Sequence, residues 1–421
     1  MGILMLGDAR QHKVAQRKGR LLLRRLERPS ELFANLGPNW FATIMGTGVI
    51  ATAGASLPVQ FPALHAVATL FWAATSLLLL LLAASTGMHW ARHRDNARAH
   101  HNHPVMAHFY GAPPMALLTV GAGTLLLGKD VLGERLALGI DAVLWVLGTL
   151  LGLASAFAVP YLQFTRHKVS AADAFGGWLM PVVPPMVSAS TGALLLPYLP
   201  AGEARQLMLM ACYAMFGLSL LASLLIIPLV WQRLAVHKNL AAAAVPTLWI
   251  VLGPLGQSIT AANLLGANAH FAVSGTLLHA MEAFGVLYGV PVLGFALLWA
   301  ALAAAITLRT ARSGLPFSLA WWSFTFPVGT CVTGLSGLAA HTGLGAFKAM
   351  AAVGYVLLVG AWVLVAVRTF RGSVLEGTLF QGAAPAPAPQ QAPVPQPALS
   401  PTAAWPRSSR RSGEVRAADV A

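Results

Sequence analysis

Long apolar runs separated by short polar connections recur from residue 38 to residue 367 of the chain. One run contains six consecutive leucines, Leu77 to Leu82. Comparable runs stay apolar for about 20 residues, which is the length that a helix needs to cross a bilayer. Strands of a membrane barrel would instead alternate apolar and polar residues. The pattern therefore predicts an all-α polytopic membrane protein.

We predict ten transmembrane helices from these runs. They cover residues 38–56, 64–86, 105–127, 136–162, 176–198, 207–231, 246–266, 282–306, 317–340 and 346–367. Because the loops are short, neighbouring spans are expected to pack as five antiparallel hairpins. The transmembrane domain is thus placed at 38–371, without a separate soluble domain.

Lysine and arginine positions predict the orientation of these spans, since basic residues accumulate on the cytoplasmic side. If both termini are cytoplasmic, all but four of the 27 basic residues fall on that side. The exceptions are Lys129, Arg135, Arg205 and Lys348. The sequence therefore predicts an inner- or plasma-membrane protein with the N-terminus and C-terminus inside.

The two termini differ from the spans in composition. Residues 1–37 form a basic segment that we expect to lie on anionic lipid headgroups, so the net charge of +14 does not require a nucleic-acid partner. Residues 372–421 are rich in proline, alanine and glutamine and are predicted to be a disordered cytoplasmic tail.

Prolines divide the ten spans into two classes. The five odd-numbered spans contain ten prolines and the five even-numbered ones only three. Because a broken helix is tolerated at membrane depth only against protein or a water-filled cavity, we expect the odd spans to form an inner ring around a central pore. Pore-lining candidates on them are Thr47, Pro114, Pro184, Pro185, Gly253, Pro254 and Pro327. Close packing by small residues is the simpler alternative.

Charge narrows what this path could carry. Only 10% of the residues are charged, against about 25% in an average soluble domain, and the odd spans contain no Lys, Arg, Asp or Glu. Cation carriers usually need intramembrane carboxylates. Backbone N–H groups at helix breaks, together with hydroxyls, favour anions instead. Asp141 and Glu282 are interpreted as first-turn helix caps, and Glu282 is retained as an alternative proton site.

Catalytic and metal-binding patterns are not found. The chain has no phosphate-binding GxxxxGK[ST] loop and no HExxH pair, so we expect neither an enzyme nor a cofactor. His93, His100, His101 and His103 lie in a basic loop with Asp95 as the only acidic neighbour. Solvated loop histidines explain this cluster better than a metal site.

Several motifs on the odd spans resemble the tellurite-resistance/dicarboxylate transporter family, in the order and spacing of that family. They are NWFATIMGTG at 39–48, HP at 103–104, WLMPVVPP at 178–185, PTLW at 246–249, GPLGQ at 253–257 and WWSFTFP at 321–327. The family includes tellurite-resistance channels, plant slow anion channels, fungal malate permeases and fungal sulfite pumps.

The resemblance implies ten helices in five hairpins around a quasi-five-fold pore, and a homotrimer with one pore in each subunit. It also implies a phenylalanine gate on the ninth span, which corresponds to Phe326. Phe41 resembles a second pore-facing aromatic and Gly46 a small residue beside the path. Phe324, two residues before Phe326, remains a rival for the gate.

Transport of small anions is therefore the expected function, with C4-dicarboxylates such as malate first. Sulfite efflux and an inorganic-anion or tellurite-resistance channel are alternatives within transport. A non-conducting membrane scaffold or receptor that acts through its proline-rich tail is an alternative of another class.

The orientation gives a direct test. We expect reporter fusions placed after Arg371 to read cytoplasmic and fusions in the 199–206 loop to read external, because the basic residues follow this division. Paired alkaline phosphatase and fluorescent-protein fusions measure it, and the reverse pattern would contradict the orientation.

Overall fold

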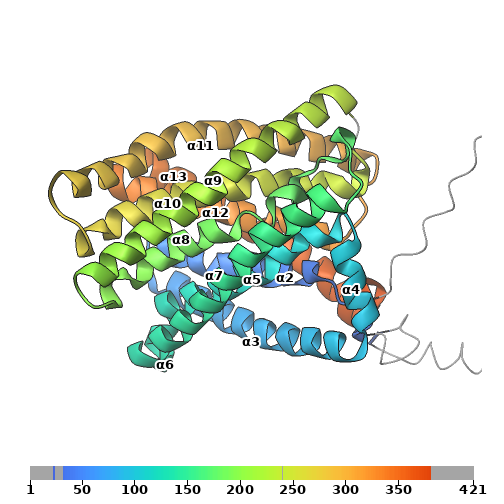
Figure 1. Ribbon diagram of the computed structural model, residues 1–421, viewed down its shortest axis with the longest axis horizontal. Coiled ribbons are helices and arrows are strands. Elements are labelled where there is room, and N and C mark those ends of the chain that lie inside the picture. Colours follow the sequence, from blue (N-terminus) through green and yellow to red (C-terminus); the bar gives the residue numbers. More distant parts are fainter. Residues whose placement is uncertain (1–21, 24–31, 239, 381–421) are drawn as a thin grey trace, which may run out of the picture. The chain divides into compact units, whose positions relative to one another are not determined.

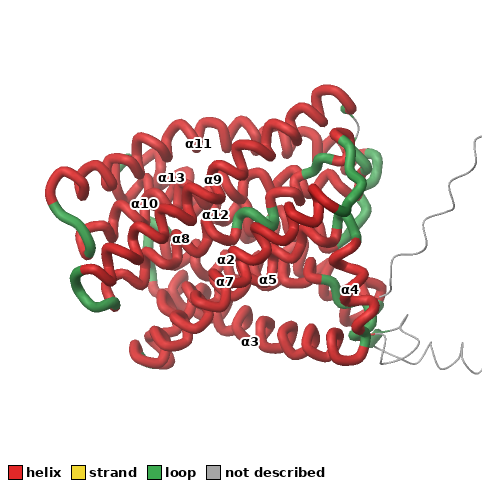
Figure 2. The backbone as a smooth tube through the Cα atoms, in the orientation of Figure 1, coloured by secondary structure: helices red, strands yellow, loops and turns green. Residues whose placement is uncertain are grey.

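The computed structural model describes residues 22–23, 32–238 and 240–380 of the chain, and within these ranges the regular secondary structure is entirely helical (Figure 2). Seven stretches in the described residues are long and apolar enough to cross a membrane. They coincide with the second, third, fourth, sixth, seventh, eighth and tenth predicted spans. The predicted tail from residue 381 onward and residues 1–21 and 24–31 of the predicted segment 1–37 lie outside the described residues.

The first, fifth and ninth predicted spans contain shorter helices of 16, 12 and 17 residues. They are α2 (Phe41–Ser56), α8 (Pro184–Leu195) and α12 (Phe326–Thr342). At 1.5 Å per residue each is shorter than the roughly 30 Å hydrocarbon core, and short helical turns before them, and after α8, extend the spans. The count of ten membrane spans therefore stays a prediction.

Five helices pack side by side in a closed ring at the centre. Their order is α2, α5 (Ala112–Gly123), α8, α10 (Leu252–Asn268) and α12, which returns to α2. Each belongs to an odd-numbered predicted span, so the inner ring expected from the prolines is present. Proline also explains the breaks, since Pro184 and Pro327 lie in the first turns of their helices, where a missing N–H is tolerated.

Longer, continuous helices surround this ring (Figure 1). They are α3 (Pro62–Arg92), α7 (Glu134–Thr165), α9 (Glu203–His237), α11 (Gly275–Arg312) and α13 (Gly345–Phe370). Their most apolar windows are only 22–33% buried, whereas those of the third and seventh spans are 67% and 78% buried. Leucines such as Leu80, Leu225 and Leu287 are exposed on the outer helices, as expected of a lipid-facing surface.

Tryptophan side chains connect the two layers through their indole N–H groups. Trp72 on α3 donates to the hydroxyl of Thr124 at 2.9 Å, and Trp145 on α7 donates to the carbonyl of Ser188 at 3.0 Å. Trp299 on α11 donates to the carbonyl of Leu248 at 2.8 Å. Three further bonds of this kind join Trp249 to Thr307, Trp322 to Thr369 and Trp362 to Thr47. These contacts fix the outer helices on the ring without placing a charge in the membrane.

Two acidic residues lie deeper in their helices than expected. α7 begins at Glu134 and α11 at Gly275, so Asp141 and Glu282 lie at the end of the second turn, and the cap interpretation is wrong for both. Both helices extend beyond the apolar runs that were used to set the boundaries. Asp141 is 1% exposed, and its carboxylate has no hydrogen-bond partner.

The start of the predicted disordered tail also needs correction. Residues 371–375 and 378–380 form two short helical turns, η11 and η12. The ring of Phe380 stacks on Trp40 at 5.0 Å, and Asn35 donates to the carbonyl of Phe380 at 3.1 Å. An aromatic anchor therefore holds the chain to the bundle as far as residue 380.

The histidine cluster lies around α4 (Arg94–Asn102), between α3 and the third span. The ring of His100 stacks on His89 at 5.5 Å. Burial, together with the neighbouring His89, His101 and His103, lowers the pKa of His100 to about 4. Among the described residues, no three His, Cys, Asp or Glu side chains are arranged to hold a metal ion.

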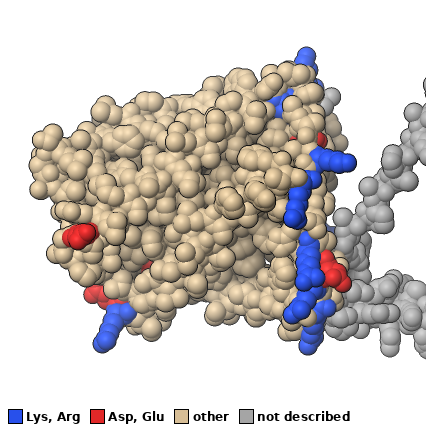
Figure 3. Space-filling view, viewed as in Figure 1, with Lys and Arg blue, Asp and Glu red and all other residues tan. Residues whose placement is uncertain are grey.

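On the face shown in Figure 3, charged side chains gather at the two ends of the bundle and leave the surface between them almost free of charge. On the face shown, most lysines and arginines lie at the end where α4 is found. This distribution agrees with a bundle that spans a bilayer, while the side of the membrane on which each end lies stays a prediction.

Close packing between α10 and α12 depends on Gly256. A β-carbon at this position would lie 2.6 Å from the carbonyl carbon of Thr330 and would also overlap the backbone N of Cys331. Backbone cannot move aside as a flexible side chain can, so we expect Gly256→Ala to cost about 1–3 kcal/mol of unfolding free energy.

Gly253, one turn earlier on the same helix, is the matched control, because a β-carbon there would meet only Pro327 at 4.0 Å. Thermal unfolding in detergent measures both variants. Equal melting temperatures for Gly256→Ala and Gly253→Ala would contradict the packing argument.

Candidate functional site

The ring encloses a cavity of about 250 Å³, lined by residues from all five inner helices. Its wall includes Val49 on α2, Thr119 on α5, Thr191 on α8, Gln257 on α10 and Thr330 on α12. The cavity extends to Ser56 and Ala340, both exposed, near the C-terminal ends of α2 and α12. It therefore opens toward the end of the bundle at which the inner helices finish.

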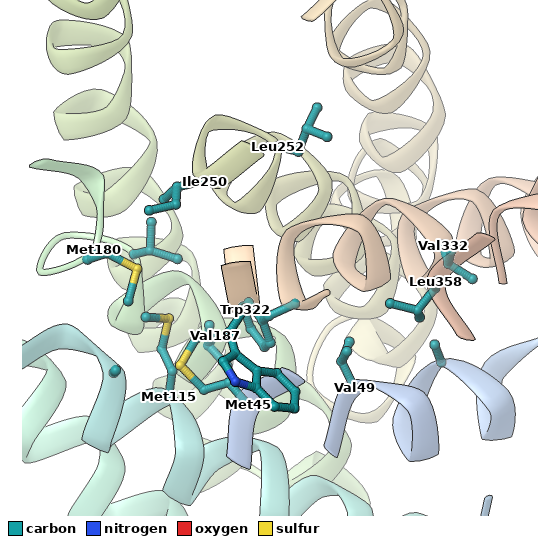
Figure 4. Packing of buried hydrophobic residues seen from close by; sticks show 14 of the residues in the cluster. Met45, Val49, Met115, Met180, Val187, Ile250, Leu252, Trp322, Val332 and Leu358 are labelled. Carbon is teal, nitrogen blue, oxygen red and sulfur yellow. The ribbon is translucent and has the colours of Figure 1, made fainter. Parts of the chain in front are cut away.

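A second, smaller cavity of about 30 Å³ lies toward the N-terminal ends of the inner helices. Its lining includes three methionines, Met45, Met115 and Met180, together with Trp322. The methionine side chains extend toward one another from different segments of the ring (Figure 4). Flexible thioether side chains fill irregular gaps well, so this half of the path is narrow and apolar.

Phe326 lines both cavities and separates them. It is the first residue of α12 and its side chain is 7% exposed. The helix can begin here because Pro327, which has no N–H to donate, occupies its first turn. The break in the ninth span thus sets a large aromatic ring at the junction of the two cavities.

Phe324, the rival for the same role, faces the other way. Its ring contacts Trp249 and Trp321 edge-on, each at 5.6 Å between centroids. It also lines an outward groove with residues of α11 and α13, such as Leu297 and Leu357. Although only two positions apart across the helix break, Phe324 packs between tryptophans whereas Phe326 lines the cavities.

Four of the predicted pore residues lie on the cavity walls. Phe326 lines both cavities, and Gly253, Pro254 and Pro327 line the smaller one. All four lie at the N-terminal ends of α10 and α12, where the seventh and ninth spans change from 3-10 turns to α-helix.

The other predicted pore residues face neighbouring helices and line neither cavity, which corrects their assignment. Thr47 accepts the indole N–H of Trp362 at 3.1 Å, on the side facing α13. Pro114 and Pro184 face α7, because a β-carbon on Gly152 would lie 3.8 Å and 2.9 Å from their β-carbons. Pro185 and Phe41 are buried without lining either cavity.

Gly46 packs against the turn that precedes Phe326. A β-carbon there would lie 2.5 Å from the ring of Trp322 and would overlap the hydroxyl of Thr325, the residue before Phe326. Glu282 is away from both cavities, half-exposed, with a carboxylate oxygen 3.3 Å from Nδ1 of His279.

Backbone N–H groups at the break in the fifth span are not available to an anion, contrary to the expectation from its prolines. The N–H groups of Val182 and Val183 donate to the carbonyl of Leu179, both at 3.2 Å. Those of Met186 and Val187 donate to the carbonyl of Val183. The prolines interrupt the α-helix, but local hydrogen bonds to residues three and four positions earlier satisfy these donors.

Gln257 was missed in the sequence, although it is the only side-chain amide on the cavity wall among the described residues. It is 6% exposed and donates to the hydroxyl of Ser190. A side-chain amide inside a span without charged residues could have marked Gln257 as a candidate for the cavity wall. The described residues lining either cavity include no Lys, Arg, His, Asp or Glu.

A family comparison identifies what this arrangement belongs to. Residues 35–370, which contain the whole ring and both cavities, match the model of the SLAC1 family, described as a voltage-dependent anion channel. The chain belongs to the SLAC1 family. It is therefore a multi-pass membrane protein of an anion channel and transporter family, and the family resemblance noted on its motifs is confirmed.

Individual SLAC1-family relatives cover most of the chain at modest identity. The sulfite efflux pump SSU1 of Trichophyton rubrum is 28% identical over 344 residues, which is 79% of this chain and 89% of the pump. The SSU1 pump of Arthroderma benhamiae has the same identity and coverage. An uncharacterized transporter of Methanocaldococcus jannaschii is 27% identical over 368 residues, covering 86% of this chain and all of the relative.

Proposed function

We propose that the protein transports small anions through the path between the five inner helices, with sulfite as its first substrate. The observation that carries this proposal is the pair of uncharged cavities separated by Phe326. The relatives described above that have a named substrate are sulfite efflux pumps. The comparisons give malate no support, so the sulfite alternative takes its place.

Phe326 is proposed as the gate of this path. A buried phenyl ring between two small cavities forms an apolar constriction, and such a constriction excludes hydrated ions by dewetting. The ring must move for an anion to pass, and it lies at the break between the 3-10 helix at Leu319–Phe324 and α12.

The remaining expectations stand as proposals with this function. The protein is placed in the cell membrane with both termini cytoplasmic, in agreement with its basic residues. A homotrimer with one path per subunit follows from the family resemblance. Glu282 is kept as a secondary proton site, although its distance from the cavities argues for a purely structural role.

Flux measurements on the purified protein test the substrate. In proteoliposomes at equal concentrations, we expect faster uptake of sulfite than of malate, because a path with a 250 Å³ cavity and a 30 Å³ cavity favours the smaller anion. Nitrate and chloride report the general anion preference, and protein-free vesicles give the leak. Malate uptake that exceeds sulfite uptake would contradict the choice of substrate.

Truncation of the two phenylalanines tests the gate. We expect Phe326→Ala to raise anion flux several-fold per folded protein, since it removes the apolar constriction. Phe324→Ala is the matched control: it removes a ring that packs between two tryptophans, so it should lower stability without raising flux.

Flux normalised to protein in the membrane, with the melting temperature of each variant, separates the two effects. Flux in Phe326→Ala that is equal to or below that of the parent would contradict the gate.

A further inference from the structure

Hydroxyl groups make up most of the polar wall of the large cavity, and each of them already donates a hydrogen bond within the protein. Nine serine and threonine side chains line the wall, and each lies within hydrogen-bond distance of a backbone carbonyl of its own helix. Thr260 and Thr333 also share a hydrogen bond at 2.7 Å, in which one hydroxyl donates to the other. The hydroxyl of Thr119, for example, lies 2.7 Å from the carbonyl oxygen of Met115. Because a carbonyl can only accept, these hydroxyls present lone pairs to the cavity.

Gln257 is the exception on this wall. Its Nε2 donates to the hydroxyl of Ser190, which itself donates to the carbonyl of Val187 at 2.9 Å. With the proton of Ser190 on the carbonyl of Val187, the hydroxyl oxygen accepts from the amide, and the nitrogen of Gln257 is assigned to the side of Ser190. An amide nitrogen carries two N–H groups, so one remains for a ligand. Among the described residues lining the cavity, it is the only uncommitted side-chain donor.

We propose that Gln257 is the donor that contacts the transported anion, and that the acceptor-rich wall selects a monoanion bringing its own O–H group. For sulfite this means the hydrogen sulfite monoanion in place of the sulfite dianion. The inference rests on the proposed transport of sulfite and names the species that the path carries.

Two physical arguments support the monoanion. The O–H of hydrogen sulfite can donate to a hydroxyl oxygen of the wall while another of its oxygens accepts from Gln257, so both partners are satisfied. The sulfite dianion has no O–H to donate, so its oxygens would face the lone pairs of the wall hydroxyls with only the amide of Gln257 as a donor. Its desolvation also costs more, because the cost rises with the square of the charge and the described lining residues include no cation to offset it.

The wild-type protein in proteoliposomes tests the species directly. Total sulfite is held constant while the pH on both sides is raised from about 6 to about 8, and nitrate flux is measured in parallel. Hydrogen sulfite gives way to the dianion over this range, whereas nitrate keeps its charge. We expect sulfite flux to fall, approaching about tenfold per pH unit, with nitrate flux level.

Nitrate also controls for titration of the protein itself, including that of the histidine cluster around α4. Protein-free vesicles correct for the permeation of neutral sulfur dioxide at the acidic end. Sulfite flux that stays level or rises with pH, against a level nitrate flux, would overturn the choice of the monoanion. Loss of flux for both anions at every pH would overturn the transport function on which the inference rests.

Substitution of Gln257 tests the donor. Gln257→Met keeps the length of the side chain and removes its N–H groups, so we expect the flux of both hydrogen sulfite and nitrate to fall about tenfold, as for the loss of one hydrogen bond to a charged group. Asn268→Met is the matched control, since Asn268 is an amide on the same helix outside the cavity that donates to the carbonyl of Leu264. Its flux should equal that of the wild type.

Gln257→Leu is a second variant, which removes the N–H groups without adding a charge, in case the methionine variant does not fold. Wild-type flux of both anions in a folded Gln257 variant would overturn the role of Gln257. The pH profile of the wild-type protein does not depend on either variant.

Discussion

Inside a bilayer, every backbone N–H and C=O group must find its partner within the protein, and this constraint organises the whole bundle. Continuous α-helices satisfy it alone, so α3, α7, α9, α11 and α13 can stand on the outside with leucines exposed. Segments broken by proline cannot, and they are found where other helices cover them. The closed ring of α2, α5, α8, α10 and α12 is thus the place where irregular backbone is tolerated, and the path runs through it.

The same constraint shapes the chemistry of the path. Serine and threonine reach the cavity, but each hydroxyl has a backbone carbonyl or another hydroxyl as its acceptor, so the cavity wall is polar without being rich in donors. The break in the fifth span closes with local backbone hydrogen bonds, and the N–H groups in these bonds are likewise unavailable. Among the described residues, the lining would offer an anion one free amide N–H and many lone pairs, so it would bind the anion weakly and selectively.

The inner ring could be predicted from the sequence because prolines mark the segments with an interrupted backbone hydrogen-bond pattern. Such segments cannot face lipid, so they must lie inside the bundle. Phe326 was predicted through a family resemblance, while the register across a helix break, which directs Phe324 outward and Phe326 inward, becomes visible only in three dimensions. Thr47, Pro114 and Pro184 were assigned to the path although they face α13 and α7, because belonging to an inner helix does not say which side of it a residue occupies. Asp141 and Glu282 lay deeper than expected because the helices extend beyond their apolar runs.

Selectivity in such a path would depend on the order in which an anion meets the polar cavity, the ring of Phe326 and the apolar cavity. An anion entering from the open end of the larger cavity exchanges some water for the amide of Gln257 and the surrounding hydroxyls before it meets the phenyl ring. Beyond Phe326 lie the methionines and Trp322, which offer an anion almost no hydrogen bonds. Under the proposed function, the energetic barrier would lie at and beyond the ring, where partial dehydration has no compensation, and the polar cavity would lower the free energy of the anion before that barrier. A fixed positive charge would hold the anion more strongly there, but it would also slow its release. An uncharged wall that ends at a movable aromatic ring favours fast passage over tight binding.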